Sequence, residues 1–128
     1  MSRLTRLKLV LTGLVLATSF AAGWAQAKGP AVTDAAISVA ELPRQGTQTY
    51  VLIHQGGPFA HEKDGVVFGN RERLLPAEKR GYYREYTVAT PGSRHRGVRR
   101  IVCGGQPTTP DTCYYTADHY ASFRKIVP

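Results

Sequence analysis

The stretch GYYREYTVA, residues 81–89, decides the fold class, because aromatic and β-branched residues alternate along it with charged ones. Successive side chains of a β-strand point to opposite faces of the sheet, so Tyr83, Glu85 and Thr87 are predicted to share one face. The opposite face receives Tyr82, Arg84, Tyr86 and Val88. The strand therefore places one carboxylate among aromatic side chains.

Further short antiparallel strands are predicted where β-branched or aromatic residues are bounded by Gly, Pro, Asp or Asn, at residues 66–68, 97–103 and 121–127. After Arg94, the period of two places Arg96, Val98 and Arg100 on one face. Two arginines are therefore expected to project together from one surface of the sheet.

A single helix is predicted upstream of the strands, over residues 43–55. Pro43 suits its first turn, residues 50–53 supply an apolar face, and Gly56-Gly57-Pro58 ends it. One helix followed by a run of strands indicates an α+β fold, in which the N-terminal helix packs on one face of a twisted antiparallel sheet.

The chain is predicted to consist of a secretory signal peptide, a flexible leader and one folded domain, at residues 1–27, 28–40 and 41–128. Basic residues precede an apolar run over residues 9–22, and Ala-Gln-Ala at residues 25–27 offers the small side chains that signal peptidase requires. An uncleaved anchor is the alternative, although the run is shorter than the ~20 residues that usually span a bilayer. We therefore expect secretion, to the periplasm or the medium, and a mature form without a membrane segment.

The mature domain is expected to be small and basic. Cleavage removes three of the 17 Lys and Arg residues and none of the nine Asp and Glu residues, so the formal net charge falls from +8 to +5. Such a charge suits a polyanion such as nucleic acid, although charge alone supports solubility equally well. A domain of ~100 residues buries one small core and has no room for a cofactor domain, so no cofactor is expected.

The two cysteines, Cys103 and Cys113, lie in the exported part, where an oxidising compartment lets thiols pair. We expect one disulfide between them, with two free thiols as the alternative. Closing so short a loop stabilises a protein by roughly 3 kcal/mol in the chain-entropy account.

Four side chains meet the chemical requirements of RNA cleavage. A base that deprotonates the 2′-hydroxyl, an acid that protonates the departing 5′-oxygen and cations around the phosphorus suffice. Glu85, His119, Arg96 and Arg100 supply these groups. From residue types alone, Glu85 is equally an ion-pair partner, His119 a surface residue and the arginines a solvated basic stripe. The histidines lack a close-set ligand pattern, so no metal is expected.

Seven blocks of the sequence follow a recognisable order. They are GPF at 57–59, DGVVF at 64–68, NRE at 70–72, GYYREYTV at 81–88, TPG at 90–92, RGVRRI at 96–101 and YYTADHY at 114–120. In this order they resemble the small guanyl-specific bacterial ribonucleases, the family of barnase and the Streptomyces enzymes, from Leu42 to Val127. The resemblance implies the microbial ribonuclease fold and a metal-independent endoribonuclease that cleaves single-stranded RNA 3′ of guanine.

The resemblance assigns the catalytic roles residue by residue. Glu85 matches the general base, His119 the general acid, Arg100 the arginine that stabilises the phosphate, and Arg96 a second phosphate contact. The implied reaction is transesterification to a 2′,3′-cyclic phosphate. A slower hydrolysis to a 3′-phosphate follows, with the roles of base and acid exchanged.

The resemblance also implies that residues 68–72 bind guanine. The Phe68 ring stacks on the base, backbone amides near Asn70 and Arg71 donate to O6, and the Glu72 carboxylate accepts from N1–H and N2–H. Such a carboxylate favours guanine and leaves adenine unpaired. Tyr120 matches an aromatic that lines the phosphate and base pocket. Without the resemblance, Phe68 is read more readily as a plain core residue.

Two features depart from the family pattern. Gly69 stands where the family usually has a polar side chain, so we expect a more flexible base loop and a weaker guanine preference. The connection from Cys103 to Cys113 is longer than in the Streptomyces enzymes, and this pair differs from the one that bridges their ends. A local staple across the connection is expected in its place.

The expected partner is single-stranded RNA, and the protein is expected to be a monomer. Several relatives need an inhibitor protein to protect the cell that produces them. The resemblance therefore implies a second partner, a small acidic barstar-like inhibitor that complements the arginine-rich face. A basic RNA-binding module that stacks bases on Phe68, Tyr83 and Tyr120 without cleaving them is the alternative from another functional class. Nutrient scavenging and antagonism of other cells are both compatible with such an exported enzyme.

Overall fold

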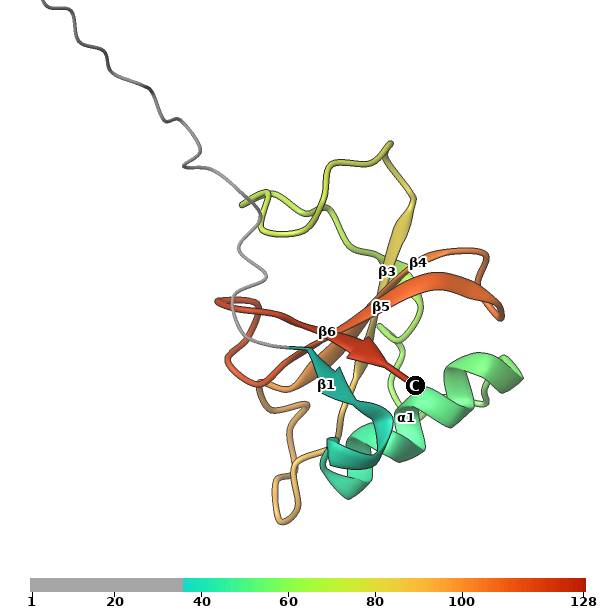
Figure 1. Ribbon diagram of the computed structural model, residues 1–128. Coiled ribbons are helices and arrows are strands. Elements are labelled where there is room, and N and C mark those ends of the chain that lie inside the picture. The colour runs from blue at the N-terminus through green and yellow to red at the C-terminus, as the bar shows by residue number, and fades with distance from the viewer. Residues whose placement is uncertain (1–35) are drawn as a thin grey trace, which may run out of the picture.

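The computed structural model describes residues 36–128, so the predicted signal peptide and most of the predicted leader lie outside the described residues. Six strands form one sheet in the order β1-β6-β5-β4-β3-β2, and helix α1 packs against it (Figure 1). The elements are β1 (Ile37–Ser38), a 3-10 turn (Val39–Glu41), α1 (Arg44–Gln55), β2 (Val66–Val67), β3 (Tyr83–Thr87), β4 (Arg100–Gly105), β5 (Pro110–Thr116) and β6 (Arg124–Val127). Neighbouring strands are antiparallel except for β1 and β6, which run parallel. The predicted α+β fold is confirmed.

The folded part begins before the predicted start at residue 41. Ile37 in β1 pairs with Ile126 of β6, and its side chain is buried in the main core. The turn after β1 is closed by Glu41, whose carboxylate accepts a hydrogen bond from the Ser38 amide at 3.0 Å. The predicted end of the leader at residue 40 is therefore wrong, because a strand of two residues is too short to show a recognisable alternation.

Helix α1 begins one residue later than predicted and is followed by Gly56, whose φ of 85° is a conformation that favours glycine. Its buried residues are Gly46, Thr49 and Ile53, spaced three and four residues apart as an amphipathic helix requires. Val51 is 45% exposed. The predicted apolar face is therefore wrong at Val51, because consecutive residues point in different directions around a helix.

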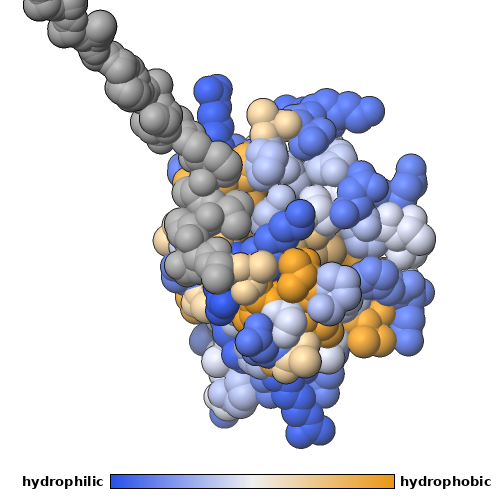
Figure 2. All heavy atoms as spheres, in the orientation of Figure 1, coloured by the Kyte–Doolittle hydropathy of each residue, from blue (hydrophilic) through white to orange (hydrophobic). Residues whose placement is uncertain are grey.

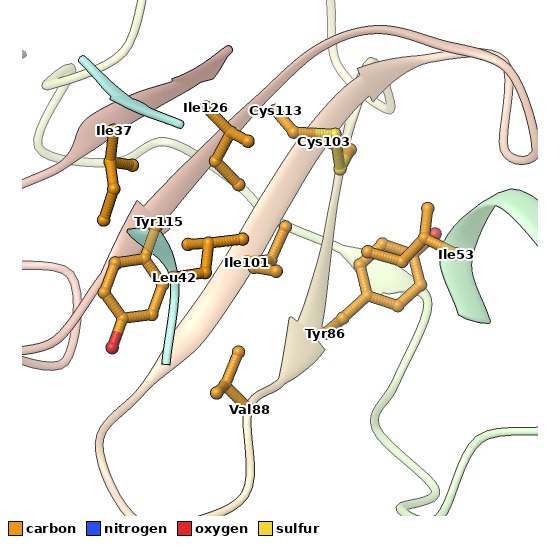
Figure 3. Packing of buried hydrophobic residues seen from close by; sticks show 10 residues of the cluster. All are labelled: Ile37, Leu42, Ile53, Tyr86, Val88, Ile101, Cys103, Cys113, Tyr115 and Ile126. Atoms are coloured by element: carbon orange, nitrogen blue, oxygen red, sulfur yellow. A yellow bond between two sulfur atoms is a disulfide. The ribbon is translucent and has the colours of Figure 1, made fainter. Parts of the chain in front are cut away.

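The two faces of the sheet have separate cores. The main core lies on the side of α1 and consists of Ile37, Leu42, Ile53, Tyr86, Val88, Ile101, Cys103, Cys113, Tyr115 and Ile126 (Figure 3). The opposite core consists of Leu75, Tyr83, Val102, Tyr114 and Phe123. Tyr86 and Tyr83 thus lie on opposite faces of β3, as the alternation predicts. Glu85 shares the parity of Tyr83, so β3 directs it away from α1.

The face of the domain drawn in Figure 2 is mainly polar. Figure 2 shows hydrophilic residues over most of the face in view, with hydrophobic residues gathered in a limited patch. The large apolar residues that remain exposed are Val51, Val66, Val67 and Val98. No helix within residues 36–128 is long and apolar enough to cross a membrane.

The chain between the two cysteines forms a β-hairpin, which the sequence did not predict. Strands β4 and β5 pair with Cys103 opposite Cys113, and the predicted disulfide joins the two residues. Gly104 lies under the ring of Tyr82, where an added Cβ would come within 2.1 Å of the ring. The prediction missed β5 because Pro107, Pro110 and their polar neighbours are typical of a turn.

Reduction of this disulfide is expected to lower the free energy of unfolding by roughly 3 kcal/mol, because the unfolded chain regains the freedom of a short loop. The reduced protein should still fold, since β4 keeps its backbone pairing with β3 and β5. Urea unfolding with and without reductant measures the difference. A variant with Cys103→Ser and Cys113→Ser is the control and should not respond to reductant. Equal midpoints for the oxidised and reduced wild type would contradict the prediction.

Candidate active site

Glu85 projects from the middle of β3 on the face away from α1. Its Oε1 atom accepts hydrogen bonds from the Tyr120 hydroxyl at 2.6 Å and from Arg96 Nη2 at 3.2 Å. Nε of Arg100 lies 3.8 Å from the same oxygen. The Glu85 side chain is 16% exposed. The carboxylate is therefore held by three polar groups and remains open to a ligand on one side.

Arg100 is the most deeply buried charged residue of this cluster, at 3% exposure. Its Nη1 donates to the carbonyls of Arg99 at 2.8 Å and Gly97 at 3.1 Å, and its Nε donates to the Tyr120 hydroxyl at 3.1 Å. The guanidinium carbon lies 5.8 Å from the centroid of the Tyr120 ring. A buried cation requires such partners. They fix the guanidinium in one orientation beside the carboxylate.

Arg96 reaches the same carboxylate from a loop and not from a strand. Its Nε donates to Thr87 Oγ1 at 2.8 Å, and its Nη2 lies 3.9 Å from Asp64 Oδ1. Asp64 is fixed in turn, because Oδ1 accepts a hydrogen bond from the Thr87 amide at 2.7 Å and the side chain is only 4% exposed. Asp64 and Thr87 together hold Arg96 against Glu85.

The predicted strand over residues 97–103 is wrong at its start, because β4 begins only at Arg100. Val98, predicted on the same strand face as the two arginines, is 48% exposed in the preceding loop. Gly97 has a φ of 69°, which turns the chain before β4 and ends the strand alternation there. The two arginines still meet at Glu85, through a loop that period-two reasoning does not describe.

His119 and Tyr120 form a turn after β5 in an uncommon backbone conformation, with φ of 57° and 75°. Asp118 holds this turn, since its carboxylate accepts hydrogen bonds from the Thr116 hydroxyl at 2.8 Å and the Ser122 amide at 2.9 Å. Burial alone would raise the pKa of Asp118, but hydrogen bonds from Ser122 and Thr116 lower it overall. An ionised carboxylate therefore maintains a strained turn, and such strain is concentrated at functional sites.

His119 lies beside this cluster with an exposed side chain. Its amide donates to the Val98 carbonyl at 2.9 Å, and its ring centroid lies 4.8 Å from that of Tyr120. Within residues 36–128, no hydrogen bond or ion pair joins the His119 ring to Glu85. The two groups are therefore neighbours of one tyrosine without being paired to each other, so they are available to act on different atoms.

Tyr120 connects the parts of the site. Its hydroxyl donates to Glu85 and accepts from Arg100. Burial and the hydrogen bond to Glu85 raise the pKa of Tyr120 to about 12. The hydroxyl is therefore protonated at neutral pH and serves as a donor to the carboxylate.

Tyr120→Phe is expected to lower the free energy of unfolding by about 1 to 3 kcal/mol, because Arg100 and Glu85 are each deprived of a hydrogen-bond partner. The pKa of Tyr120 is raised in the folded state, from 10.0 to about 12. The stability that its hydroxyl contributes is therefore complete below pH 10 and disappears as the pH rises toward 12. Urea unfolding at pH 8 and pH 11.5 should show the wild type and the variant converging. Tyr50→Phe serves as the control, and a difference independent of pH would contradict the assignment.

A cavity of about 200 Å³ adjoins the Glu85 cluster, with Tyr120 belonging to both. Its lining consists of Phe68, Gly69, Asn70, Arg71, Glu72, Leu74, Tyr120 and Phe123. The Phe68 ring centroid lies 5.1 Å from that of Tyr120 and 6.0 Å from that of Phe123. The structure thus brings together, around one cavity, all five residues predicted to bind the base.

Asn70 gives this cavity a fixed wall. Its side chain donates to the Leu75 carbonyl at 3.0 Å and accepts from the Leu75 amide at 3.1 Å. Its φ of 52° turns the chain, and its carbonyl accepts from the Arg73 amide at 2.9 Å. The Asn70 side chain is therefore occupied within the protein.

Sequence reasoning gave no role to Asp64 or Asp118, although both lie in the sequence blocks that carry the family resemblance. Each is an aspartate in a turn whose carboxylate accepts backbone hydrogen bonds, and Asp followed closely by Gly, or Asp near Thr and Ser, is the available signal. Tyr83, expected in the alternative as a stacking platform, is 3% exposed and donates its hydroxyl proton to the Pro76 carbonyl. It cannot stack on a base. Within residues 36–128, no group of three His, Cys, Asp or Glu side chains could hold a metal ion.

Comparison with known proteins shows the family to which this chain belongs. A family model described as ribonuclease matches residues 25–127. Guanyl-specific ribonuclease Sa of Kitasatospora aureofaciens is 52% identical over 90 residues, which cover 70% of this chain and 91% of that protein. The chain belongs to the guanyl-specific microbial ribonucleases.

Two other relatives and two solved structures extend this similarity. Guanyl-specific ribonuclease St of Saccharopolyspora erythraea is 49% identical over 91 residues, covering 71% of this chain and 86% of that protein. Guanyl-specific ribonuclease Sa3 of K. aureofaciens is 60% identical over 85 residues, 66% of this chain, but the chain spans only 58% of Sa3. Ribonuclease Sa2 complexed with mononucleotides has a TM-score of 0.68 at 47% identity, covering 73% of this chain and 94% of that one. Ribonuclease Sa2 with guanosine-2'-cyclophosphate has a TM-score of 0.67 at 47% identity, and the match covers 73% of this chain and 97% of that one.

Proposed function

We propose that this member of the guanyl-specific ribonucleases is a secreted endoribonuclease that cleaves single-stranded RNA on the 3′ side of guanine. One observation carries the proposal. Arg96 and Arg100 each place a guanidinium nitrogen within 4 Å of Glu85 Oε1, and Tyr120 joins this cluster to a base-sized cavity. A carboxylate, two cations and a base pocket are, together with the nearby His119, the parts that a specific RNA-cleaving site needs.

In the first step, Glu85 accepts the proton of the 2′-hydroxyl as the O2′–P bond forms. The P–O5′ bond breaks, and His119 donates a proton to the departing O5′. The products are a 2′,3′-cyclic phosphate and a free 5′-hydroxyl. Arg100 and Arg96 face the negative charge that builds up on the phosphoryl oxygens, and their fixed positions avoid reorganisation during the step.

In the second step, His119 takes a proton from a water molecule whose oxygen bonds to phosphorus. The P–O2′ bond breaks, and protonated Glu85 returns its proton to the departing O2′. The 3′-phosphate is the final product. No step requires an ion or a cofactor, since the proton transfers and the arginines account for all charges.

Guanine is proposed to enter the cavity against Phe68, with Glu72 accepting from N1–H and N2–H and backbone amides near Asn70 and Arg71 donating to O6. The support is the convergence of these residues on one cavity beside the cleavage site. One relative of known structure binds guanosine-2'-cyclophosphate. A base held here places its ribose next to Tyr120, the residue shared with the Glu85 cluster.

Export and partners belong to the same proposal. Residues 1–27 act as a cleaved signal peptide ahead of a monomeric enzyme, and the disulfide suits an oxidising compartment. A small acidic inhibitor protein is proposed as a second partner, because the arginines at Glu85 present positive charge to any macromolecule that covers the site.

The decisive experiment incubates the purified protein, with EDTA present, with an RNA of defined sequence and maps the 3′-terminal base and phosphate of every product. We expect products that end in guanosine 2′,3′-cyclic phosphate, converting slowly to 3′-phosphate. The rate should depend on pH in a bell-shaped manner. Intact RNA would contradict cleavage, and products ending in all four bases equally would contradict the guanine assignment.

A further inference from the structure

A second cavity shares part of the segment that lines the base pocket. Its volume is about 510 Å³, within the usual size range of ligand sites. It shares Phe68, Gly69, Asn70 and Arg71 with the base pocket, and its own lining residues are Val67, Glu78, Lys79, Arg80, Gly81 and Tyr83. The two cavities therefore adjoin each other at residues 68–71. Figure 1 shows the chain between β2 and β3, which supplies most of this lining, rising from the sheet at the end remote from α1.

The charge of this second cavity suits an anion. Arg71, Lys79 and Arg80 line it with positive charge, against the single carboxylate of Glu78. All four side chains are exposed, so a ligand can reach them. A basic groove next to an aromatic base pocket is the combination by which proteins follow the backbone of a single-stranded nucleic acid.

Both walls of the cavity are anchored. On one side, the side chain of Asn70 forms two hydrogen bonds with Leu75. On the other side, the Tyr82 amide donates to the Lys79 carbonyl at 3.1 Å, and the Tyr83 hydroxyl donates to the Pro76 carbonyl at 2.7 Å. The cavity is therefore a preformed feature of the loop, and binding there does not require the backbone to be ordered first.

We infer that this cavity is a subsite for the ribose phosphate of the nucleotide on the 5′ side of the bound guanosine. The inference rests on the proposed function. The scissile phosphate, on the 3′ side of guanosine, belongs beside Glu85 and Arg100, on the Tyr120 side of the base pocket. The second cavity shares residues 68–71 with the base pocket, but Tyr120 does not line it. The RNA that passes through it is therefore the part that does not cross the cleavage site, which is the 5′ flank.

The test compares three substrates that contain one guanosine each: GpU, the 5′-extended UpUpGpU and the 3′-extended GpUpUpU. For the wild type, 5′ extension should raise kcat/KM, mainly through KM. In the double variant Lys79→Gln and Arg80→Gln this gain should shrink by about 3- to 10-fold, while GpU cleavage stays the same. Glu78→Gln should enlarge the gain. The salt dependence of the gain should fall by about 0.7 in log–log slope for each phosphate that the double variant no longer neutralises.

The matched control is the double variant Arg44→Gln and Lys125→Gln, which removes the same charge from exposed positions on α1 and β6. It should keep the full gain from 5′ extension. If the control lost as much of the gain from 5′ extension, the effect would come from the net charge of the protein and not from this cavity. If the Lys79 and Arg80 double variant lost as much kcat/KM on GpUpUpU, the cavity would not be specific for the 5′ flank. Either outcome overturns the inference.

Binding measurements separate the subsite from the proposed function. Calorimetry with guanosine 3′-phosphate and with UpUpGp, the expected product of the extended substrate, needs no turnover. Tighter binding of UpUpGp by the wild type, abolished in the Lys79 and Arg80 double variant, supports the subsite even if cleavage fails. Equal affinities of the wild type for the two ligands would overturn the subsite and leave the cleavage mechanism untouched.

Discussion

Glu85→Gln is expected to lower kcat/KM for guanosine-containing RNA by about 10²- to 10⁴-fold, because the amide fills the same volume but cannot accept the 2′-hydroxyl proton. The change should leave the fold in place. Arg100 keeps the carbonyls of Gly97 and Arg99 as acceptors, and Arg96 keeps Thr87 Oγ1. The loss should therefore appear in kcat, in a protein that remains folded under the conditions of the assay. Initial rates on a dinucleotide and urea unfolding of the same preparation measure both.

Two further substitutions sharpen this expectation. Glu85→Asp keeps a carboxylate but withdraws it by one methylene from the Tyr120 hydroxyl and Arg96, so its rate should lie between the wild type and Glu85→Gln. Glu62→Gln removes an exposed carboxylate from the loop before β2 and should leave the rate unchanged. Near-native activity of Glu85→Gln would reject this carboxylate as the base.

The alternation of residues 82–88 was sufficient to predict one strand and the face on which Glu85 lies. It succeeded because β3 is a regular strand with a core on each side, so burial follows the period of two. The same reasoning failed after Arg94. There the chain runs as a loop up to Arg100, and the position of Arg96 is decided by Asp64 and Thr87. Contacts between segments that are far apart in the sequence do not follow a periodic pattern, so they cannot be predicted from alternation.

The resemblance to a family supplied what local patterns could not. The residues predicted to bind the base, 68–72, form no regular element, and the turn that carries His119 and Tyr120 has a backbone conformation that propensity disfavours. The order of sequence blocks nevertheless predicted that these segments belong to one site, and the structure places them around one cavity and one carboxylate. Neither the local patterns nor the resemblance predicted β1 and β5 as strands. β1 is too short to show an alternation, and β5 begins among turn-forming residues.

Glu72→Ala is expected to lower kcat/KM for GpN dinucleotides by about 10²- to 10³-fold, roughly 3 to 4 kcal/mol, because it removes the charged acceptor of two hydrogen bonds from guanine. The rate on ApN should hardly change, since adenine offers no N1–H or N2–H to that carboxylate. The ratio of the two rates, measured within one preparation, is the readout. It is independent of the starting preference, which Gly69 is expected to weaken.

The geometry distinguishes this role from an ion pair with a neighbouring arginine. Glu72 is exposed and lines the base cavity, and within residues 36–128 no salt bridge joins it to Arg71 or Arg73. Removal of an exposed ion pair would change stability by at most about 1 kcal/mol and would affect all substrates alike. Glu72→Gln keeps one acceptor oxygen without the charge, so its guanine-to-adenine ratio should fall between those of the wild type and Glu72→Ala. An unchanged ratio in Glu72→Ala would remove residues 68–72 from base recognition. Cleavage by Glu85, Arg100 and His119 would stand, because these residues are assigned to the ribose and phosphate and not to the edge of the base.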